Sequence, residues 1–185
     1  MNEPAAITRK KTRQIRVGTV PVGGGAPVAV QSMTSTDTRD VKATVAQIAR
    51  LEEAGCEIVR VAVLDEDAAS AIRDIRKEIR MPLIADIHFS HRLAIAAMES
   101  GADAVRVNPG NLGRDRIREV IAAAKACGAS MRIGVNSGSV EKDLLAKYGG
   151  PCAAALVESA LGRVHFIQAL GFSEFKLSLK SSDVP

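Results

Sequence analysis

The sequence predicts an α/β protein of the TIM (β/α)8 barrel type, truncated after about six strands. Short apolar strands alternate with amphipathic helices from Asp40 onward, which is the pattern of βα units that build a parallel sheet. Glycines end successive helices, and the strand after each glycine carries one cation between apolar neighbours. A content of 46% hydrophobic and 25% charged residues fits a folded globular chain and excludes collagen-like and low-complexity classes.

Residues 1–26 are expected to form a basic extension and a hairpin, and residues 27–185 a partial barrel. Two short strands are predicted around the cluster Gly23, Gly24 and Gly25, which supplies a flexible turn. A phosphate-cradling loop would need the spacing G-x-x-x-x-G-K-S/T and a following helix, and this stretch runs into another strand instead. The glycine cluster is therefore interpreted as a turn rather than a phosphate site.

The barrel elements follow from apolar periodicity, as where Val45, Ile48 and Leu51 share one face of the first helix. We expect strands over residues 28–33, 58–63, 83–88, 104–107, 131–135 and 175–179. We expect helices over residues 41–54, 66–79, 90–100, 114–127, 140–147 and 153–170. Asp37 or Thr38 is predicted near the N-cap of the first helix. Six strands fall short of the eight in a closed barrel, so about two βα units are expected beyond this chain.

A repeat of glycines and cations distinguishes a closed barrel from an open doubly wound sheet. The glycines are Gly55, Gly101, Gly128 and Gly171, and the cations that follow them are Arg60, Arg106, Arg132 and Lys176. Since side chains alternate between the two faces of a strand, each cation points away from the face of its apolar neighbours. An open sheet would bury these charges under helices at large cost, whereas a barrel directs them inward, toward the mouth where such barrels build their sites.

Convergent cations at one mouth predict a binding site for a ligand with more than one phosphate. The residues assigned to this site are Arg60, Arg106, Arg132 and one lysine, Lys176 or Lys180. The plain alternative, a solvated or ion-paired face, fits a single cation better than several in register. Asn108 and Asn136 share the inward parity and would orient a small polar ligand, although the segment NPGN also fits a simple turn.

Asp86 and His88 share a face at the end of an apolar strand. His88 is a candidate proton donor or ligand contact, because an imidazole titrates near neutral pH, and Asp86 is a candidate to orient it. The alternative is a structural role, which is also the interpretation of His91 and His165 on helices. The run EKDLLAKYG, residues 141–149, is interpreted as an exposed helical turn without chemistry.

Composition argues against several classes of function. The net charge of +4 and the pI of about 9.1 suggest a nucleic-acid partner, but no Trp, one Tyr and four Phe leave few side chains to stack on bases. Cys56, Cys127 and Cys152 form no C-x-x-C pair, so neither a disulfide framework nor a zinc site is expected, and all three are predicted to be small buried residues. No apolar run approaches the ~18 residues that span a bilayer, and no secretory signal is found, which predicts a cytoplasmic protein without a membrane partner.

Several segments together carry a resemblance to a known family. In order, they are VQSMTST, IVRVAV, PLIADIHF, VRVNPGN, RIGVNSGSVEKDLLAKYG and FKLSLKSSD. From about Thr12 to Asp183 the chain resembles the N-terminal barrel of the bacterial 4-hydroxy-3-methylbut-2-enyl diphosphate synthases. The resemblance implies an oxidoreductase of the non-mevalonate isoprenoid pathway, which reductively converts 2-C-methyl-D-erythritol 2,4-cyclodiphosphate with electrons from flavodoxin or ferredoxin.

The same resemblance implies roles for individual residues. The implied substrate contacts are Arg60, Arg106, Arg132, Asn108, Asn136 and His88, with Asp86 in support and Lys176 or Lys180 completing the clamp. It also implies a [4Fe-4S] cluster held by three cysteines and a glutamate in a C-terminal domain that this chain lacks, so no metal ligand is assigned here. A homodimer would place the cluster domain of one subunit over the barrel mouth of the other, and the barrel alone is not expected to turn over substrate.

Two other interpretations stay open at this point. One is a different barrel enzyme that acts on a phosphorylated or pterin-like substrate, because barrels host many chemistries. The other is a non-catalytic fragment that binds anions or nucleic acid, motivated by the basic pI.

Overall fold

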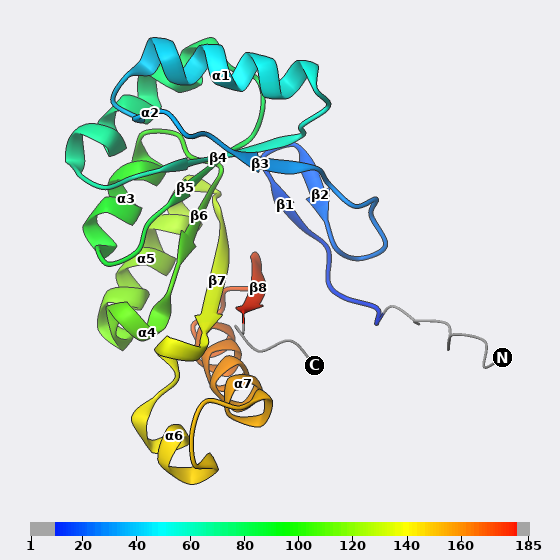
Figure 1. Ribbon diagram of the computed structural model, residues 1–185, viewed down its shortest axis with the longest axis vertical. Helices are drawn as coiled ribbons and strands as arrows, with labels where there is room; N and C mark the ends of the chain where they lie inside the picture. The colour runs from blue at the N-terminus through cyan, green and yellow to red at the C-terminus, as the bar shows by residue number, and fades with distance from the viewer. Residues whose placement is uncertain (1–9, 181–185) are drawn as a thin grey trace, which may run out of the picture.

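The computed structural model describes residues 10–180, which form a curled parallel sheet with helices along its outer face (Figure 1). The six strands of this sheet are β3 (Gln31–Met33), β4 (Ile58–Ala62), β5 (Leu83–Asp86), β6 (Ala104–Val107), β7 (Ser130–Asn136) and β8 (Phe175–Lys180). Each strand pairs in parallel with its neighbour in the sequence. The curled sheet is a partial barrel, which confirms the predicted fold class.

The helices follow the strands in the alternation that the sequence predicts. The outer layer contains α1 (Val41–Glu53), α2 (Glu66–Glu78), α3 (His91–Glu99), α5 (Arg114–Cys127) and α7 (Ala153–Ala169). Three short helices extend the connections after β6 and β7, namely α4 (Pro109–Leu112), the 3-10 helix η1 (Ser137–Ser139) and α6 (Lys142–Tyr148). The segment NPGN, which also fitted a simple turn, therefore begins a short helix, with Asn108 as its N-cap.

The core between sheet and helices is made by the apolar neighbours of the cations. Val59 and Val61 on either side of Arg60 are fully buried against the outer helices, in one cluster with Ile72 and Ile75 of α2. Complete burial of each such side chain contributes about 1.5–3 kcal/mol. The alternation predicted from the strand period is confirmed, because the cation of this strand faces away from the helices.

The first helix begins at Val41, as predicted, but its N-cap differs from the prediction. Asp40, rather than Asp37 or Thr38, is its N-cap, and its carboxylate accepts a hydrogen bond from the backbone N–H of Ala43 at 3.0 Å. Asp37 is instead engaged by Arg39 at 2.6 Å, which lowers the pKa of that carboxyl to about 2. The Thr38 hydroxyl donates to the backbone carbonyl of Ala62 at 2.6 Å. Both predicted caps therefore have other partners, a neighbouring arginine for Asp37 and the distant Ala62 carbonyl for Thr38.

The N-terminal hairpin closes the amino-terminal end of the sheet. Its strands are β1 (Ile15–Val17) and β2 (Val20–Val22), joined by a two-residue turn at Gly18 with φ of +55°. Strands lie on both sides of the triple-glycine cluster, β2 before it and β3 after it, but the hairpin turn is at Gly18 rather than in the cluster. Val17 is fully buried in a cluster with Ile58, Ile84 and Ala104 on the inner face. An apolar plug therefore occupies this end of the interior.

The cysteines divide into two environments. Cys56 is buried, as predicted, whereas Cys127 and Cys152 are exposed, so the prediction for these two was wrong. Cys127 is the last residue of α5 and Cys152 is the N-cap of α7, and helix ends face solvent here.

Ile84→Ala tests the apolar plug beneath the hairpin. We expect the free energy of unfolding in urea to fall by about 2–5 kcal/mol, because the change leaves a cavity against Val17 and Ile58. Val28→Ala is the matched control, since Val28 is 73% exposed and its loss should change stability by less than about 0.5 kcal/mol. Equal effects of the two changes would contradict the plug.

Candidate anion-binding site

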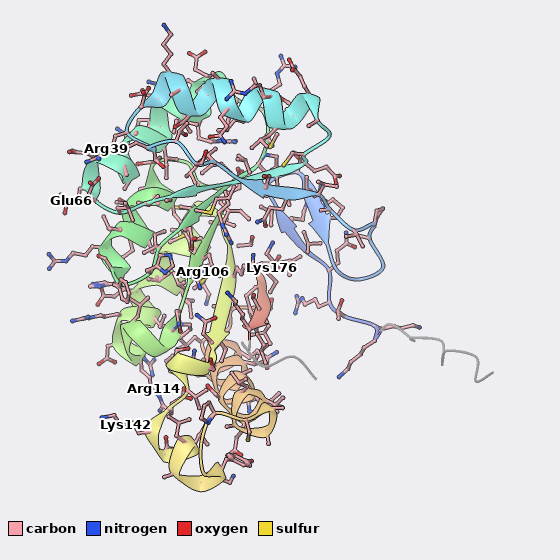
Figure 2. All side chains as sticks on the ribbon, in the orientation of Figure 1. Arg39, Glu66, Arg106, Arg114, Lys142 and Lys176 are labelled. Atoms are coloured by element: carbon pink, nitrogen blue, oxygen red, sulfur yellow. The ribbon has the colours of Figure 1, made fainter. Side chains whose placement is uncertain are left out.

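Strand register brings the cations onto one row of the inner face. Asp86 of β5 pairs with Arg106 of β6, Arg106 pairs with Arg132 of β7, and Arg132 pairs with Lys176 of β8. Arg106 and Lys176 lie at the same level of the sheet in Figure 2. Arg60 of β4 pairs with Ile84, two residues before Asp86 on β5, and so lies next to the row. We call Arg60, Arg106, Arg132 and Lys176 the cation row.

Asp86 is the carboxylate that anchors one end of the cation row. Its Oδ1 accepts a hydrogen bond from Arg106 Nη1 at 3.4 Å, and its Oδ2 lies 3.7 Å from Arg60 Nε. The Asp86 side chain is only 8% exposed, so these charge pairs are weakly screened. Arg60 also approaches the Met33 sulfur at 3.3 Å, which fixes its direction across β3. One buried carboxylate therefore orients two guanidinium groups.

His88 lies just beyond the end of β5, in contact with the same charges. Its Nδ1 is 3.1 Å from Arg106 Nη1, and its Nε2 is 3.8 Å from Asp86 Oδ2. A guanidinium only donates hydrogen bonds, so Nδ1 accepts, and the proton of the neutral ring is on Nε2. The side chain is half exposed. The structure thus brings His88 and Asp86 together with Arg106, and His88 retains access to solvent.

The cation row carries more positive charge than its carboxylate neutralises. Burial, followed by the nearby charges of Arg60 and Arg106, lowers the pKa of Arg132. Burial, followed by repulsion from Arg132 and Arg60, lowers the pKa of Lys176. Both shifts mark groups whose charged form is penalised, and a bound anion would remove that penalty. The electrostatics favour a ligand with several negative charges.

Two small residues support the cation row. The hydroxyl of Ser178 accepts a hydrogen bond from Arg132 Nη2 at 2.8 Å. Gly134 leaves room for Arg106, because a Cβ at this position would lie 3.3 Å from Arg106 Nε. Both residues share the inward parity of the cations, yet neither was predicted as a site residue. Parity is the signal that could have found them.

The two candidate lysines occupy different places on β8. Lys176 is partly buried and pairs with Arg132, whereas Lys180 is exposed and pairs with Asn136 at the end of β7. Lys176 therefore belongs to the cation row, and Lys180 lies toward the carboxyl end of the strand. An extended ligand could span from the row to Lys180 along this edge.

The two candidate asparagines differ in burial and in their hydrogen bonds. Asn108 is buried, with 4% exposed, and its Oδ1 accepts hydrogen bonds from the Gly110 N–H and from Arg163 Nη1, both at 3.1 Å. Asn136 is partly buried, and its backbone N–H donates to the Ser139 hydroxyl at 3.1 Å. The acceptor oxygen of Asn108 is thus occupied, while Asn136 stands beside Lys180 at the carboxyl end of the sheet.

Arg163 is a charged residue that sequence reasoning missed. It lies on α7, is 6% exposed, and contacts Asn108, Ser139 and Glu141. Glu141 was expected to lie in a helical turn without chemistry, but it is the counterion of this arginine at 3.1 Å. A single arginine within an otherwise apolar stretch of α7 is the signal that could have identified it.

The described residues do not fit a metal cluster. Over residues 10–180, no group of three or more His, Cys, Asp or Glu side chains is arranged to hold a metal ion. The exposed Cys127 and Cys152 and the buried Cys56 do not supply the spaced thiolates that an iron–sulfur cluster needs. Within the same range, no helix is long and apolar enough to cross a membrane.

Sequence comparison relates the chain to one family. The model of the GcpE TIM-barrel domain matches residues 12–185. A 4-hydroxy-3-methylbut-2-en-1-yl diphosphate synthase (flavodoxin) from Nitratidesulfovibrio vulgaris is 58% identical over 182 residues, which are 98% of this chain and 47% of that protein. The protein of the same name from Pseudomonas syringae pv. syringae is 57% identical over 185 residues, covering all of this chain and 50% of its own length. The chain thus spans about half the length of these relatives.

Structural comparison supports the barrel fold. A dihydropteroate synthase from Stenotrophomonas maltophilia superposes with a TM-score of 0.64 at 16% identity, over 91% of this chain and 66% of that one. At such low identity the likeness concerns the fold alone.

The lowered pKa of Lys176 can be measured directly by NMR titration of labelled lysine side chains. We expect it to titrate below the ordinary value of a lysine side chain in the free protein, and its pKa to rise when inorganic pyrophosphate binds. Because the bound pKa is the higher one, pyrophosphate affinity should be greatest below the free pKa and should fall as pH rises through the bound pKa. A Lys176 that titrates at the ordinary lysine value and does not respond to pyrophosphate would contradict the site.

Proposed function

The chain belongs to the family of the GcpE TIM-barrel domain, and from this membership we propose that it is the substrate-binding barrel of an isoprenoid-pathway oxidoreductase. The reaction proposed for the whole enzyme converts 2-C-methyl-D-erythritol 2,4-cyclodiphosphate to 4-hydroxy-3-methylbut-2-enyl diphosphate. The family inferred from the sequence motifs is confirmed. The observation that carries the proposal is the cation row, whose excess charge suits a diphosphate.

The cation row would bind the two phosphates of the substrate. Arg106 and Arg132 present guanidinium forks on adjacent strands, which suits bidentate contacts to phosphate oxygens. Lys176 adds a point charge on the next strand, and Arg60 adds a second fork beside Asp86. In this proposal Asp86 orients the arginines and does not touch the phosphates, since two anions would repel each other.

The remaining candidates would contact the rest of the ligand. Asn136 and Lys180 are paired at the carboxyl end of β7 and β8, where a hydroxyl or an outer phosphate oxygen could reach both. Asn108 would contribute through its amide nitrogen, because its oxygen is already occupied. Residues 27–185 are proposed as the barrel domain, and residues 1–26 as an extension whose hairpin seals the opposite end.

The proposed conversion is a reduction, which needs a source of electrons and a source of protons. Substrate and product differ by one oxygen, so the net step takes up two electrons and two protons and releases one water. One carbon–oxygen bond of the ring breaks and its oxygen stays on the diphosphate, a second carbon–oxygen bond breaks as a hydroxyl leaves as water, and a carbon–carbon double bond forms. The names of the relatives point to flavodoxin as the electron donor, with ferredoxin as the alternative. His88 is proposed as the proton donor in its protonated, imidazolium form, because its side chain is half exposed and its Nε2 lies 3.8 Å from the Asp86 carboxylate, which would stabilise that form.

We propose that the electrons reach the substrate from a part of the enzyme other than the described residues. These residues do not fit the [4Fe-4S] cluster that the family resemblance implies, so the cluster is proposed for a C-terminal domain and no step is assigned to it here. A homodimer and a cytoplasmic location are further predictions from the same resemblance. The iron–sulfur oxidoreductase class applies to the whole enzyme rather than to this barrel.

Arg132→Gln tests the proposed substrate. In calorimetric titration we expect the affinity for the cyclodiphosphate to fall about 10- to 100-fold, because a charge-assisted hydrogen bond is lost from the middle of the cation row. Arg73→Gln on the exposed face of α2 is the matched control and should bind as the unmodified chain does. Equal affinity of both variants would count against the assignment.

The same titration separates the two alternative functions. Salt-sensitive binding of generic RNA, without a response to the cyclodiphosphate, would favour the nucleic-acid interpretation. Binding of a pterin in preference to the cyclodiphosphate would favour another barrel enzyme.

His88→Ala tests the proton donor in a full-length enzyme that carries this barrel. We expect kcat to fall about 10²- to 10⁴-fold while the affinity for the cyclodiphosphate changes less than about threefold, because the phosphates bind elsewhere. Exposed His165 provides the control, and His165→Ala should leave both quantities unchanged. A loss of affinity with unchanged kcat would instead make His88 a binding residue.

A further inference from the structure

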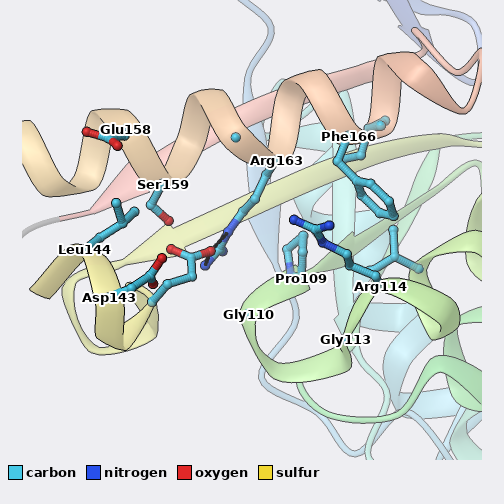
Figure 3. Close-up of a pocket in the computed structure, with 14 residues that line it drawn as sticks. Pro109, Gly110, Gly113, Arg114, Asp143, Leu144, Glu158, Ser159, Arg163 and Phe166 are labelled. Atoms are coloured by element: carbon cyan, nitrogen blue, oxygen red, sulfur yellow. Dashed lines mark hydrogen bonds and ion pairs between the residues drawn. The ribbon is translucent and has the colours of Figure 1, made fainter.

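Arg163 occupies an unusual place for a charged side chain. It is in the middle of α7, in the outer helical layer, and it is 6% exposed. Its guanidinium points from α7 toward the turns that follow β6 and β7, at the wall of a cavity of about 420 Å³ (Figure 3). A buried guanidinium is costly unless its hydrogen-bond donors are satisfied, so its partners are informative.

The partners of Arg163 come from two βα connections. Nη1 donates to Asn108 Oδ1 at 3.1 Å and lies 3.5 Å from the carbonyl oxygen of Gly134. Nη2 donates to the carbonyl oxygen of Ser139 at 2.6 Å and to Glu141 Oε1 at 3.1 Å. Nε donates to the same Glu141 oxygen at 3.2 Å. The five N–H groups of one guanidinium thus have acceptors at the end of β6, within β7 and in the loop after β7.

The junction around Arg163 is tightly packed. A Cβ at Gly110 would lie 2.8 Å from Arg163 Nη2 and 2.8 Å from the carbonyl oxygen of Ser139. Such distances are shorter than non-bonded contacts allow, so only glycine fits between the guanidinium and the η1 turn. The α4 turn and the η1 turn are therefore held against the same guanidinium from two sides.

These two turns carry residues of the proposed substrate site. Asn108 begins α4, Asn136 begins the turn that Ser139 closes, and Gly134 accommodates Arg106. We propose that Arg163 is a positioning residue, which fixes the carboxyl ends of β6 and β7 in the geometry that binds the cyclodiphosphate. The identity of the ligand rests on the proposed function, whereas the fixing of the two turns does not.

The inference is tested in a full-length enzyme that carries this barrel, with Arg163→Lys, Arg163→Met and Gly110→Ala. The lysine variant keeps the positive charge but loses the planar guanidinium. Gly110→Ala leaves Arg163 unsubstituted and places a Cβ 2.8 Å from Arg163 Nη2 and from the Ser139 carbonyl oxygen, which forces the turns apart. The first readout is amide hydrogen exchange over residues 108–113 and 137–141. The second is the dissociation constant for the cyclodiphosphate, with KM and kcat measured separately.

For Arg163→Met and Gly110→Ala we expect amide exchange over both segments to speed up at least about tenfold and the cyclodiphosphate to bind about tenfold more weakly. The reason is that the charged hydrogen bonds between Arg163 and the two turns are lost or distorted. Arg163→Lys should recover part of both effects. Lys125→Met is the matched control, since Lys125 ties α5 to the last turn of α7 through the Leu170 carbonyl at 2.8 Å and reaches neither segment. That variant should change neither the exchange over the two segments nor the binding.

A purely structural role predicts a different pattern. If Arg163→Met and Gly110→Ala lower the melting temperature while local exchange and cyclodiphosphate affinity stay within twofold of the parent, the proposal is overturned. Failure of the parent enzyme itself to bind the cyclodiphosphate would refute the proposed function. The exchange readout would still decide whether Arg163 fixes the two turns.

Discussion

Mutual repulsion among the cations of the inner face is the constraint on which the site depends. Arg106, Arg132 and Lys176 stand side by side on hydrogen-bonded strands, so the backbone ladder holds like charges together whether or not they attract. Asp86 offsets this repulsion at one end only. This repulsion, together with burial, lowers the pKa values of Arg132 and Lys176. A site assembled in this way is less stable empty than filled, which is how a fixed scaffold gains affinity for a polyanion.

The two ends of the interior differ in chemistry, and the difference gives the site its direction. At the amino-terminal end, Val17 of the hairpin packs on Ile58 and Ile84, and this contact makes the surroundings of the cation row apolar on that side. At the carboxyl end, Asn136, Lys180 and His88 leave polar groups near solvent. Low dielectric below the row strengthens its field, and access from above lets an anion reach it.

Alternation along a strand could be read from the sequence because it is a local property. Because Val59 and Val61 face the helices, Arg60 between them must face the opposite side of the sheet. The same spacing from glycine to cation in the other βα units gives the same prediction for Arg106, Arg132 and Lys176. The hairpin turn at Gly18 was misplaced, because a two-residue turn is decided by which residues pair across it. The hydrogen bond between Asn108 and Arg163 could not be predicted for a related reason. The two residues are distant in the chain and come into contact only through the packing of α7.

Gly134 shows how the inner site and the outer layer are connected through one strand. On the inner face its missing Cβ makes space for the Arg106 guanidinium, and its carbonyl oxygen lies 3.5 Å from Arg163 on the outer side. A shift of β7 toward either arginine would therefore crowd one contact and open the other. Because close-packed interiors transmit small displacements, the position of β7 is set jointly by a charge that belongs to the site and a charge buried in the helical layer. The geometry of the cation row is thus a property of both layers of the barrel, although its residues all lie on one of them.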